Sequence, residues 1–379
     1  MSSKAGLYIH IPYCSAVCPY CDFAVRVGSS TERTKFPDKL IAELALINDW
    51  AYPIDTIYFG GGTPSILSAS ALAQVLDAAS KRLPVEPDAR IHLEANPEDV
   101  TPQRLKAWRA IGVEFLSLGI QSFDDKELAW LGRRHDGEHA RTVLAEALQA
   151  GFHTVSADLI FGLPAQTLAS LERNTDTLET LTPQHASLYQ LTIHEGTTFG
   201  GLAERGKLTE LDNSPQAELF RFAHEGLGAL GLNAYEVSNF ACNEAHRSSH
   251  NQKYWAHVPY LGIGPSAHSF DGKNRWWNER TVTAYGRALE KNLRPVQECE
   301  QLSKEDVALE MLMLRLRTVD GLNLGEFTDK TDVDLVETNR TTISMLVEEG
   351  YLVHQNDLLA PTLKGLAVAD WIVGKLELG

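Results

Sequence analysis

The sequence lacks any long apolar run, although 44% of its 379 residues are hydrophobic. No stretch reaches the roughly 18 consecutive apolar residues that a membrane-spanning helix needs. The amino terminus also lacks the apolar core and the cleavage site of a secretory signal peptide. These absences predict a cytoplasmic protein, which would meet a membrane only at its periphery when it serves a membrane-bound partner.

Basic residues are in the minority. Lys and Arg number 34 against 50 Asp and Glu, which gives a formal net charge of −16 at pH 7. Because nucleic acids and anionic membranes attract positively charged proteins, this balance argues against a general nucleic-acid-binding role. The apolar content and the 22% of charged residues are ordinary for globular proteins. We therefore expect a fully folded chain with one large α/β domain and a smaller appendage.

Cysteine is scarce and unevenly placed. Cys14, Cys18 and Cys21 lie within eight residues, while Cys242 and Cys299 stand alone. This odd, uneven set is not a disulfide framework. In a reducing compartment, crowded thiols indicate metal ligands or redox groups, and three thiolates leave a tetrahedral centre one ligand short.

Strand-like runs rich in β-branched and aromatic residues alternate with stretches of helical period. The predicted strands lie at 7–11, 56–59, 91–94, 115–120, 154–160 and 186–191. The predicted helices lie at 38–49, 69–82, 101–110, 138–150 and 168–181. Such repeats predict a parallel sheet with right-handed crossovers, either doubly wound or rolled toward a barrel.

The positions of the unusual residues favour the barrel. The cysteine-rich loop at 14–21 follows the first predicted strand, and the run 60–64 follows the second. Glu94, Gln121 and Asp158 lie near the ends of the next three. Motifs at many successive strand ends suit the carboxyl-terminal mouth of a barrel better than the single crevice of an open sheet. We predict a TIM-like partial (β/α)6 barrel whose open side admits a large substrate.

Three segments differ in their patterns. Residues 1–200 carry the regular βα repeats, and residues 201–300 carry a looser pattern that we interpret as an extension of the barrel. Residues 301–379 hold helical runs at 305–317 and 335–349 followed by a short hairpin, an order typical of a winged helix. Acidic residues outnumber basic ones by 15 to 7 between residues 300 and 379, so we expect a packing or lid role there instead of DNA binding.

Cys14-x3-Cys18-x2-Cys21 places three thiols on one tight loop. A cubane 4Fe-4S cluster held by three thiolates keeps one iron open to another ligand. S-adenosylmethionine is a ligand of that kind, chelating through its amino and carboxylate groups, and an electron from the cluster then releases methionine and a deoxyadenosyl radical. The alternatives are a zinc site with a distant fourth ligand and a fortuitous group of cysteines.

Other residues at the same predicted rim suit S-adenosylmethionine. The run Gly60-Gly61-Gly62 has no side chains, so its backbone can approach the methionine moiety closely. Glu94 offers a carboxylate for an ammonium group or a ribose hydroxyl. Gln121, Arg133 and Asp158 offer an amide, a cation and a carboxylate, although such residues at the ends of elements are often solvated pairs.

Over most of its length, tail included, the chain resembles the oxygen-independent coproporphyrinogen III oxidase family of radical S-adenosylmethionine proteins. The motifs that carry the resemblance are LYIHIP at 7–12, CPYC at 18–21, FGGGTPS at 59–65, EANP at 94–97, GIQSF at 119–123, LGRRH at 131–135 and DLIFGLP at 158–164. The resemblance implies a cluster held by Cys14, Cys18 and Cys21. It also implies contacts with the cluster-bound S-adenosylmethionine from Tyr8, Gly61 and Glu94. Positions that hold a second S-adenosylmethionine in the oxidase are matched by Tyr20, Gly62, Thr63, Gln121, Arg133, Asp158 and Thr192.

Three departures from the oxidase favour the haem-chaperone (HemW-type) branch of the family. Phe23 stands where the oxidase has a fourth cysteine, and only 13 residues precede Cys14 in place of the oxidase's leader. The motif HNQKYW at 250–255 matches the signature of the chaperone branch. That branch inserts haem into target proteins, respiratory enzymes among them, and does not decarboxylate coproporphyrinogen.

The motif at 250–255 has two interpretations. His250 offers an imidazole that can ligate iron, and Tyr254 and Trp255 offer flat faces for a macrocycle, with Asn251 beside them. Spacing alone favours a packed loop in which His250 is hydrogen-bonded and Trp255 is part of the core. The resemblance reverses that preference and predicts a haem site.

The sequence therefore predicts a haem chaperone in which a 4Fe-4S cluster, S-adenosylmethionine and haem together control haem delivery. The expected partners are haem, haem-accepting apo-proteins that include membrane respiratory enzymes, an electron donor and, in a homodimer, a second copy of the chain. The competing hypotheses are an oxygen-independent coproporphyrinogen III oxidase and a structural zinc protein. Cys242 and His246 are weaker candidates for haem or metal ligands, and we expect Cys299 to be structural.

Overall fold

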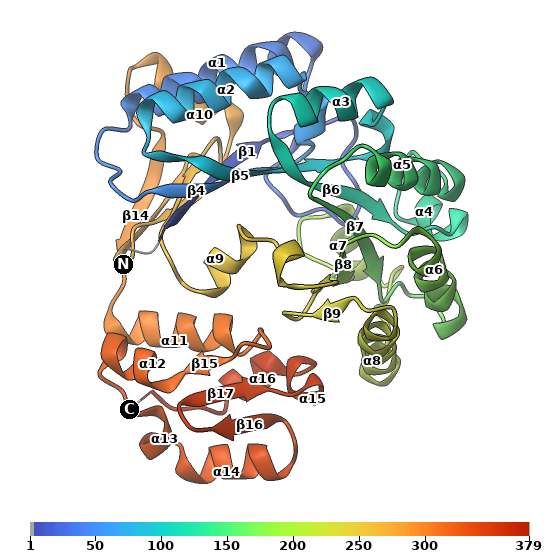
Figure 1. Ribbon diagram of the computed structural model, residues 1–379, viewed down its shortest axis with the longest axis vertical. Helices are drawn as coiled ribbons and strands as arrows, with labels where there is room; N and C mark the ends of the chain where they lie inside the picture. Colours follow the sequence, from blue (N-terminus) through green and yellow to red (C-terminus); the bar gives the residue numbers. More distant parts are fainter. Residues whose placement is uncertain (1–3, 379) are drawn as a thin grey trace.

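The computed structural model describes residues 4–378. Its centre is a sheet in which six strands run parallel in chain order. These strands are β1 (Ala5–Ile11), β4 (Ile54–Gly61), β5 (Val85–Ala95), β6 (Val113–Gln121), β7 (Thr154–Phe161) and β8 (His185–Gln190) (Figure 1). All six predicted strands are confirmed, and the structure extends most of them at one or both ends.

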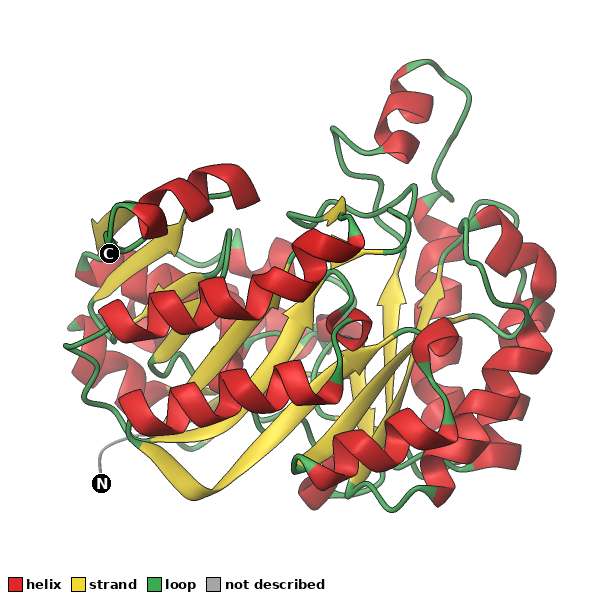
Figure 2. Cartoon of the chain, turned by 90° about the horizontal axis from the view of Figure 1, so that it is seen from above, coloured by secondary structure: helices red, strands yellow, loops and turns green. Residues whose placement is uncertain are grey.

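Helices connect these strands and cover the outside of the sheet (Figure 2). They are α1 (Ser30–Leu46), α2 (Ala69–Arg82), α3 (Pro102–Ala110), α4 (Asp125–Trp130), α5 (Gly137–Gln149) and α6 (Leu168–Leu181). The predicted start of the first helix, Asp38, is wrong. Helix α1 begins at Ser30 because Ser29 and Glu32 form a capping box, and Pro37 lies inside the helix.

The strands have two different faces, because successive side chains point to opposite sides of a sheet. One set is apolar and packs with helix residues in a single buried core that includes Leu7, Ile57, Leu93, Leu116 and Val155. The other set is largely polar or aromatic and lines the concave side: Tyr58, Glu94, Phe115, Ser117, Asp158, His185 and Ser187. Stability and binding chemistry are thus carried by alternate residues of the same strands.

The sheet is larger than predicted, because the looser segment after residue 200 joins both of its edges. Strand β11 (Tyr260–Ile263) pairs in parallel with β1, and β12 (His268–Phe270), β13 (Asn274–Asn278) and β14 (Val296–Gln301) continue antiparallel. At the other edge, β10 (Asn239–Ala241) and β9 (Asn233–Ala234) follow β8. Across residues 4–378 the strand order begins at β14 and ends at β9, so the predicted partial barrel stays open there.

Shorter elements complete this part of the chain. They are β2 (Tyr13–Cys14), β3 (Arg26–Val27), α7 (Thr198–Glu204), α8 (Asn213–Ala229), α9 (Asn251–Trp255) and α10 (Val282–Glu290). No helix within the described range 4–378 is long and apolar enough to cross a bilayer.

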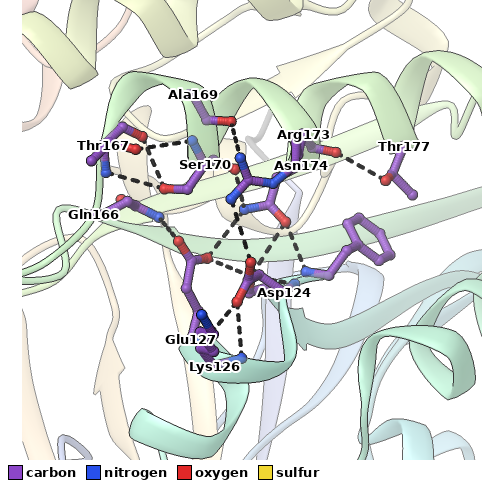
Figure 3. Close-up of polar contacts among 12 residues, drawn as sticks. Asp124, Lys126, Glu127, Gln166, Thr167, Ala169, Ser170, Arg173, Asn174 and Thr177 are labelled. Carbon is purple, nitrogen blue, oxygen red and sulfur yellow. Dashed lines mark hydrogen bonds and ion pairs between the residues drawn. The ribbon is translucent and has the colours of Figure 1, made fainter.

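A polar network fixes the connection that follows β6 (Figure 3). Glu127 in α4 accepts hydrogen bonds from Gln166 at 3.1 Å and from Asn174 of α6 at 3.2 Å. The backbone N–H of Phe123 donates to Asn174 Oδ1 at 2.7 Å. These bonds attach α6 to the loop after Gln121, so the rim of the sheet is held from outside the concave face.

The carboxyl-terminal segment has its own buried core, built from residues between 308 and 376, and lies below the sheet in Figure 1. Its elements are α11 (Lys304–Arg315), β15 (Leu322–Asn323), α12 (Leu324–Thr331), α13 (Leu335–Thr338), α14 (Arg340–Glu348), β16 (Leu352–Gln355), β17 (Leu358–Pro361), α15 (Leu363–Leu366) and α16 (Ala369–Val373). Helices followed by a hairpin agree with the predicted winged-helix order. The predicted single helix 335–349 is wrong, because it breaks at Asn339, whose side chain bonds the backbone N–H and C=O of Glu377 at 2.8 Å each.

Candidate functional site

A cavity of about 370 Å³ opens at the carboxyl ends of the central strands. The predicted site residues that line it are Cys14, Cys18, Tyr20, Cys21, Gly61, Gly62, Thr63, Glu94, Gln121, Arg133, Asp158, Thr192 and Asn251. They come from the thiol loop, from the ends of β4 to β7, and from the segments after α4, after β8 and at the start of α9. Four predicted residues are not among the lining residues: Tyr8, His250, Tyr254 and Trp255.

The thiol loop is closed by a short parallel bridge in which β2 pairs with β3. Cys14 is buried, and Cys18 and Cys21 are half-buried. Burial raises the pKa of the Cys14 thiol to about 11. Without a metal this thiol therefore keeps its proton, and binding to iron has to release it.

The donor set fits an iron-sulfur cluster. Within residues 4–378, no three His, Cys, Asp or Glu side chains converge as the ligands of one metal ion do. The three thiolates of a cubane each bind a different iron, so convergence on one point is not expected of them. Arg133 Nη1 lies 3.4 Å from Cys18 Sγ and supplies positive charge beside the thiol wall.

The glycine run allows β4 to pass directly beneath the thiol loop. Gly61 has a φ of +106°, and a Cβ added there would lie 2.6 Å from the ring of His10. A Cβ on Gly62 would lie 2.9 Å from Cys14 Sγ and 2.8 Å from the carbonyl oxygen of Tyr13. No side chain fits either position, so the glycines bring the backbone to the cavity wall.

Glu94 is held at the centre of the cavity floor. Its carboxylate accepts hydrogen bonds from the Tyr58 hydroxyl at 2.7 Å and from the Gly61 backbone N–H at 3.2 Å. Burial raises the pKa of Glu94 to about 7, and the nearby Asp158 carboxyl contributes in the same direction. A bound cation would favour the ionised form, so this group is suited to an ammonium ligand.

Asp158 is the second buried carboxyl of the floor. It accepts hydrogen bonds from Ser117 at 2.6 Å and from Ser156 at 2.7 Å. Burial raises its pKa to about 6. The Ser156 hydroxyl also contacts His185 Nδ1 at 2.8 Å, which extends the network along the concave face.

Arg133 is the one lysine or arginine among the described residues that line this cavity. Its Nη2 donates to Asn96 Oδ1 and to the Gly119 carbonyl oxygen, each at 2.8 Å. Its Nε is buried and has no hydrogen-bond partner within residues 4–378. A buried N–H group without a partner is unfavourable, so this atom indicates a place where a ligand oxygen can bind.

Tyr8 lies on the other side of the glycine run. Its hydroxyl contacts His10 Nδ1 at 3.1 Å, and its ring stacks on Tyr58 with 6.1 Å between centroids. It lines a neighbouring cavity of about 390 Å³ together with Phe23, Gly61 and Tyr254. The two cavities therefore meet at Asp22, Phe23 and Gly61.

His250 is a core residue in this structure, 1% exposed. Its Nδ1 contacts Thr56 Oγ1 and its Nε2 contacts the Tyr254 hydroxyl, each at 2.9 Å. Its ring stacks on Tyr58 with 5.0 Å between centroids, and burial lowers its pKa well below the ordinary value. Both ring nitrogens are engaged, which is the geometry of the hydrogen-bonded packed loop, and the haem-ligand role of His250 stays a prediction.

The rest of the 250–255 motif is divided among different places. Asn251 lines the first cavity and Tyr254 the second. Trp255 is half-buried, and its Nε1 has no partner within residues 4–378. The motif thus does not present one continuous face to a ligand.

The two weaker ligand candidates lie elsewhere. Cys242 is exposed, and His246 Nδ1 contacts Thr154 Oγ1 at 2.9 Å. Neither lines the described cavities. Cys299 is exposed on β14, and the expectation that it is structural stays a prediction.

Sequence reasoning missed several residues of the cavity: Tyr58, Asn96, Phe115, Ser117, His185, Ser187 and Tyr189. Most of them lie on strands, two residues apart from one another, and share the inward side. Their signal is the period-two alternation of polar or aromatic residues with Leu, Ile and Val. That pattern could have identified the concave face.

Comparison with known proteins agrees with this geometry. Residues 8–178 match the Radical SAM superfamily, and residues 302–368 match the HemN C-terminal domain. A protein named Heme chaperone HemW from Mycobacterium tuberculosis is 34% identical over 98% of this chain and 94% of its own length. The protein of the same name from Bacillus subtilis is 32% identical over 96% and 99%.

A solved structure shows the same fold. Coproporphyrinogen III oxidase (HemN) from Escherichia coli, described as a radical SAM enzyme, superposes with a TM-score of 0.83 at 20% identity, covering 99% of this chain and 90% of its own. The fold and the matched segments define a radical S-adenosylmethionine protein. Within that class, the chain belongs to the HemW family.

Proposed function

We propose that the chain holds a 4Fe-4S cluster through Cys14, Cys18 and Cys21 and binds S-adenosylmethionine at the open iron. When bound, the cluster supplies one electron to its ligand. Three thiols lining one wall of the cavity support this assignment, as does the backbone that Gly61 and Gly62 bring to it. The Radical SAM match covers this whole region.

The proposed ligand is held by groups of complementary charge. Glu94 binds the ammonium group or the ribose hydroxyls of the cluster-bound ligand. Asp158 and Arg133, whose Nε has no partner within residues 4–378, offer a carboxylate and a cation to a second S-adenosylmethionine. The residues matched to a second S-adenosylmethionine are Tyr20, Gly62, Thr63, Gln121, Arg133, Asp158 and Thr192. All of them line this same cavity.

We infer that the activity is that of a haem chaperone, which binds haem and passes it to apo-proteins. The observation that carries this choice is the similarity, over nearly the whole chain, to several proteins named Heme chaperone HemW. Phe23, in place of a fourth thiol, supports it. The proposal includes an electron donor, acceptors among respiratory membrane proteins, and a cytoplasmic site of action.

The test uses the full chain, reconstituted without air. Haem is titrated into it, and a parallel sample receives coproporphyrinogen III, S-adenosylmethionine and a reductant. The proposal predicts saturable haem binding, transfer of haem to an apo-acceptor and no protoporphyrinogen. Formation of protoporphyrinogen would identify an oxidase, an alternative that the shared fold makes worth testing. Zinc in place of iron and sulfide would identify the structural zinc protein.

A further inference from the structure

The second cavity, of about 390 Å³, is separate from the proposed cluster and S-adenosylmethionine sites, which lie in the first cavity. It lies between the start of the sheet and the segment that follows α9, and it is lined from β1, the thiol loop, α9, β11 and the loops around β12 and β13. Asp22, Phe23 and Gly61 line both cavities. A ligand in the second cavity would therefore share a wall with the cluster site.

The walls of this cavity are aromatic. The rings of Tyr254 and Tyr260 meet edge to face with 4.8 Å between centroids, and Tyr8 lines the wall formed by β1. Phe23, at the shared wall, is 61% exposed. Large flat apolar surfaces of this kind suit a planar aromatic ligand, which would cover the exposed Phe23 ring.

One imidazole faces this cavity without a hydrogen-bond partner. His268 is exposed, its ring stacks on Trp277 with 5.6 Å between centroids, and no hydrogen bond engages its ring nitrogens within residues 4–378. His10, the other histidine of the cavity, contacts the Tyr8 hydroxyl and the Ala24 carbonyl oxygen at 3.1 Å each.

The charged groups of the cavity determine how a charged ligand would be oriented in it. Arg280 is exposed and forms no ion pair within the described part of the chain. Asp22, on the thiol loop, is the carboxylate that faces the cavity and lies 3.7 Å from His194. A ligand with carboxylate groups would place them toward Arg280 and away from Asp22.

We propose that haem binds in this second cavity, with its iron ligated by His268 and a propionate paired with Arg280. The proposal rests on the proposed haem-chaperone function and assigns its haem site. It moves the axial ligand from His250, whose nitrogens are both engaged, to the imidazole that is free. Phe23 and Gly61 border both cavities, so the proposed haem site and the proposed S-adenosylmethionine site share part of one wall.

The first test replaces the ligand in the full reconstituted chain. His268→Ala is expected to weaken haem binding by about tenfold or more and to change the position of the Soret band, and added imidazole should restore the band. His354→Ala, at an exposed histidine on β16, is the matched control and should bind haem as the natural chain does. His268 is exposed, so the thermal unfolding of the variant should stay unchanged.

The second test addresses Arg280. Arg280→Gln should weaken binding of haem by about threefold to tenfold and leave binding of haem dimethyl ester, whose propionates carry no charge, unchanged. If the natural chain binds no haem, the proposed function and this site both fail. If it binds haem and His268→Ala retains the affinity and the Soret band, the site is wrong and the function stands.

Discussion

Leu93 and Glu94 are neighbours on β5, yet they belong to different regions of the molecule. Leu93 is fully buried in the core between the sheet and its outer helices, while Glu94 faces the cavity with its carboxyl held by Tyr58 and Gly61. The convex face of the sheet is apolar, and the concave face carries buried carboxyls, imidazoles and hydroxyls. One strand thus serves stability with one residue and chemistry with the next.

This comparison predicts that the largest single effect arises at the mouth of the concave face. Cys18→Ser should abolish the 4Fe-4S cluster or strongly deplete it, because loss of one thiolate leaves two irons without protein ligands. Iron and sulfide analysis after anaerobic reconstitution measures this. Cys242→Ser, at an exposed thiol away from the cavity, is the control and should keep the full iron content. A full cluster in Cys18→Ser would mean another ligand set.

On the convex face, the expected effect is on folding. Leu93→Ala should lower the free energy of unfolding by about 2–5 kcal/mol, because it removes buried apolar contacts and leaves a cavity. Urea denaturation measures it. The variant that remains folded should bind S-adenosylmethionine with unchanged affinity. A large loss of affinity in that folded fraction would show that the two faces are not separate.

Substitution of His250 tests the part of the concave face at which Thr56 lies. His250→Ala should lower the free energy of unfolding by about 1–3 kcal/mol, because it leaves the buried Thr56 hydroxyl without its partner. Haem titration of the folded variant should give nearly the affinity of the natural chain. Loss of haem binding with full stability would instead support the ligand role that the resemblance suggested.

Glu94→Gln should have the smallest effect on stability and a selective effect on binding. The affinity for S-adenosylmethionine should fall by about tenfold, since the amide keeps the shape and loses the charge. The folded-state pKa of Glu94, about 7, lies above its ordinary value of 4.5, so its protonated form favours the folded state. Its contribution is present below pH 4.5 and is lost as the pH rises toward 7.

Denaturation of the metal-free chain at several pH values measures the pH-dependent contribution of Glu94 to stability. The natural chain should lose stability relative to Glu94→Gln between pH 4.5 and 7. Equal pH profiles would contradict the raised pKa, and unchanged affinity for S-adenosylmethionine would remove Glu94 from the proposed site.

Much of the convex face could be predicted from the sequence. Helices α2 and α6 begin and end where the periodicity placed them, at 69–82 and 168–181, because one apolar stripe and local caps determine them. The six parallel strands could be predicted from the sequence equally well. Local sequence signals determine these elements, because the residues that face the buried core have to be apolar.

The concave face depends on contacts between distant segments. Strand β11 pairs with β1 although some 250 residues separate them, and no local sequence pattern predicts that pairing. His250 contacts Thr56 across 194 residues, so its motif could not show that the imidazole is covered. Gln121 adopts a φ of +68°, which its side chain does not predict. The thiols, the glycines and Glu94 could be identified because their chemistry lies in short motifs.

The most direct measurement is Mössbauer spectroscopy of the chain reconstituted with ⁵⁷Fe, recorded before and after addition of S-adenosylmethionine. We expect a 4Fe-4S cluster in which one iron differs from the other three and changes its parameters when the ligand binds. Three of the irons should keep thiolate-like parameters throughout. A spectrum in which all four irons have protein ligands and none responds to S-adenosylmethionine would contradict it.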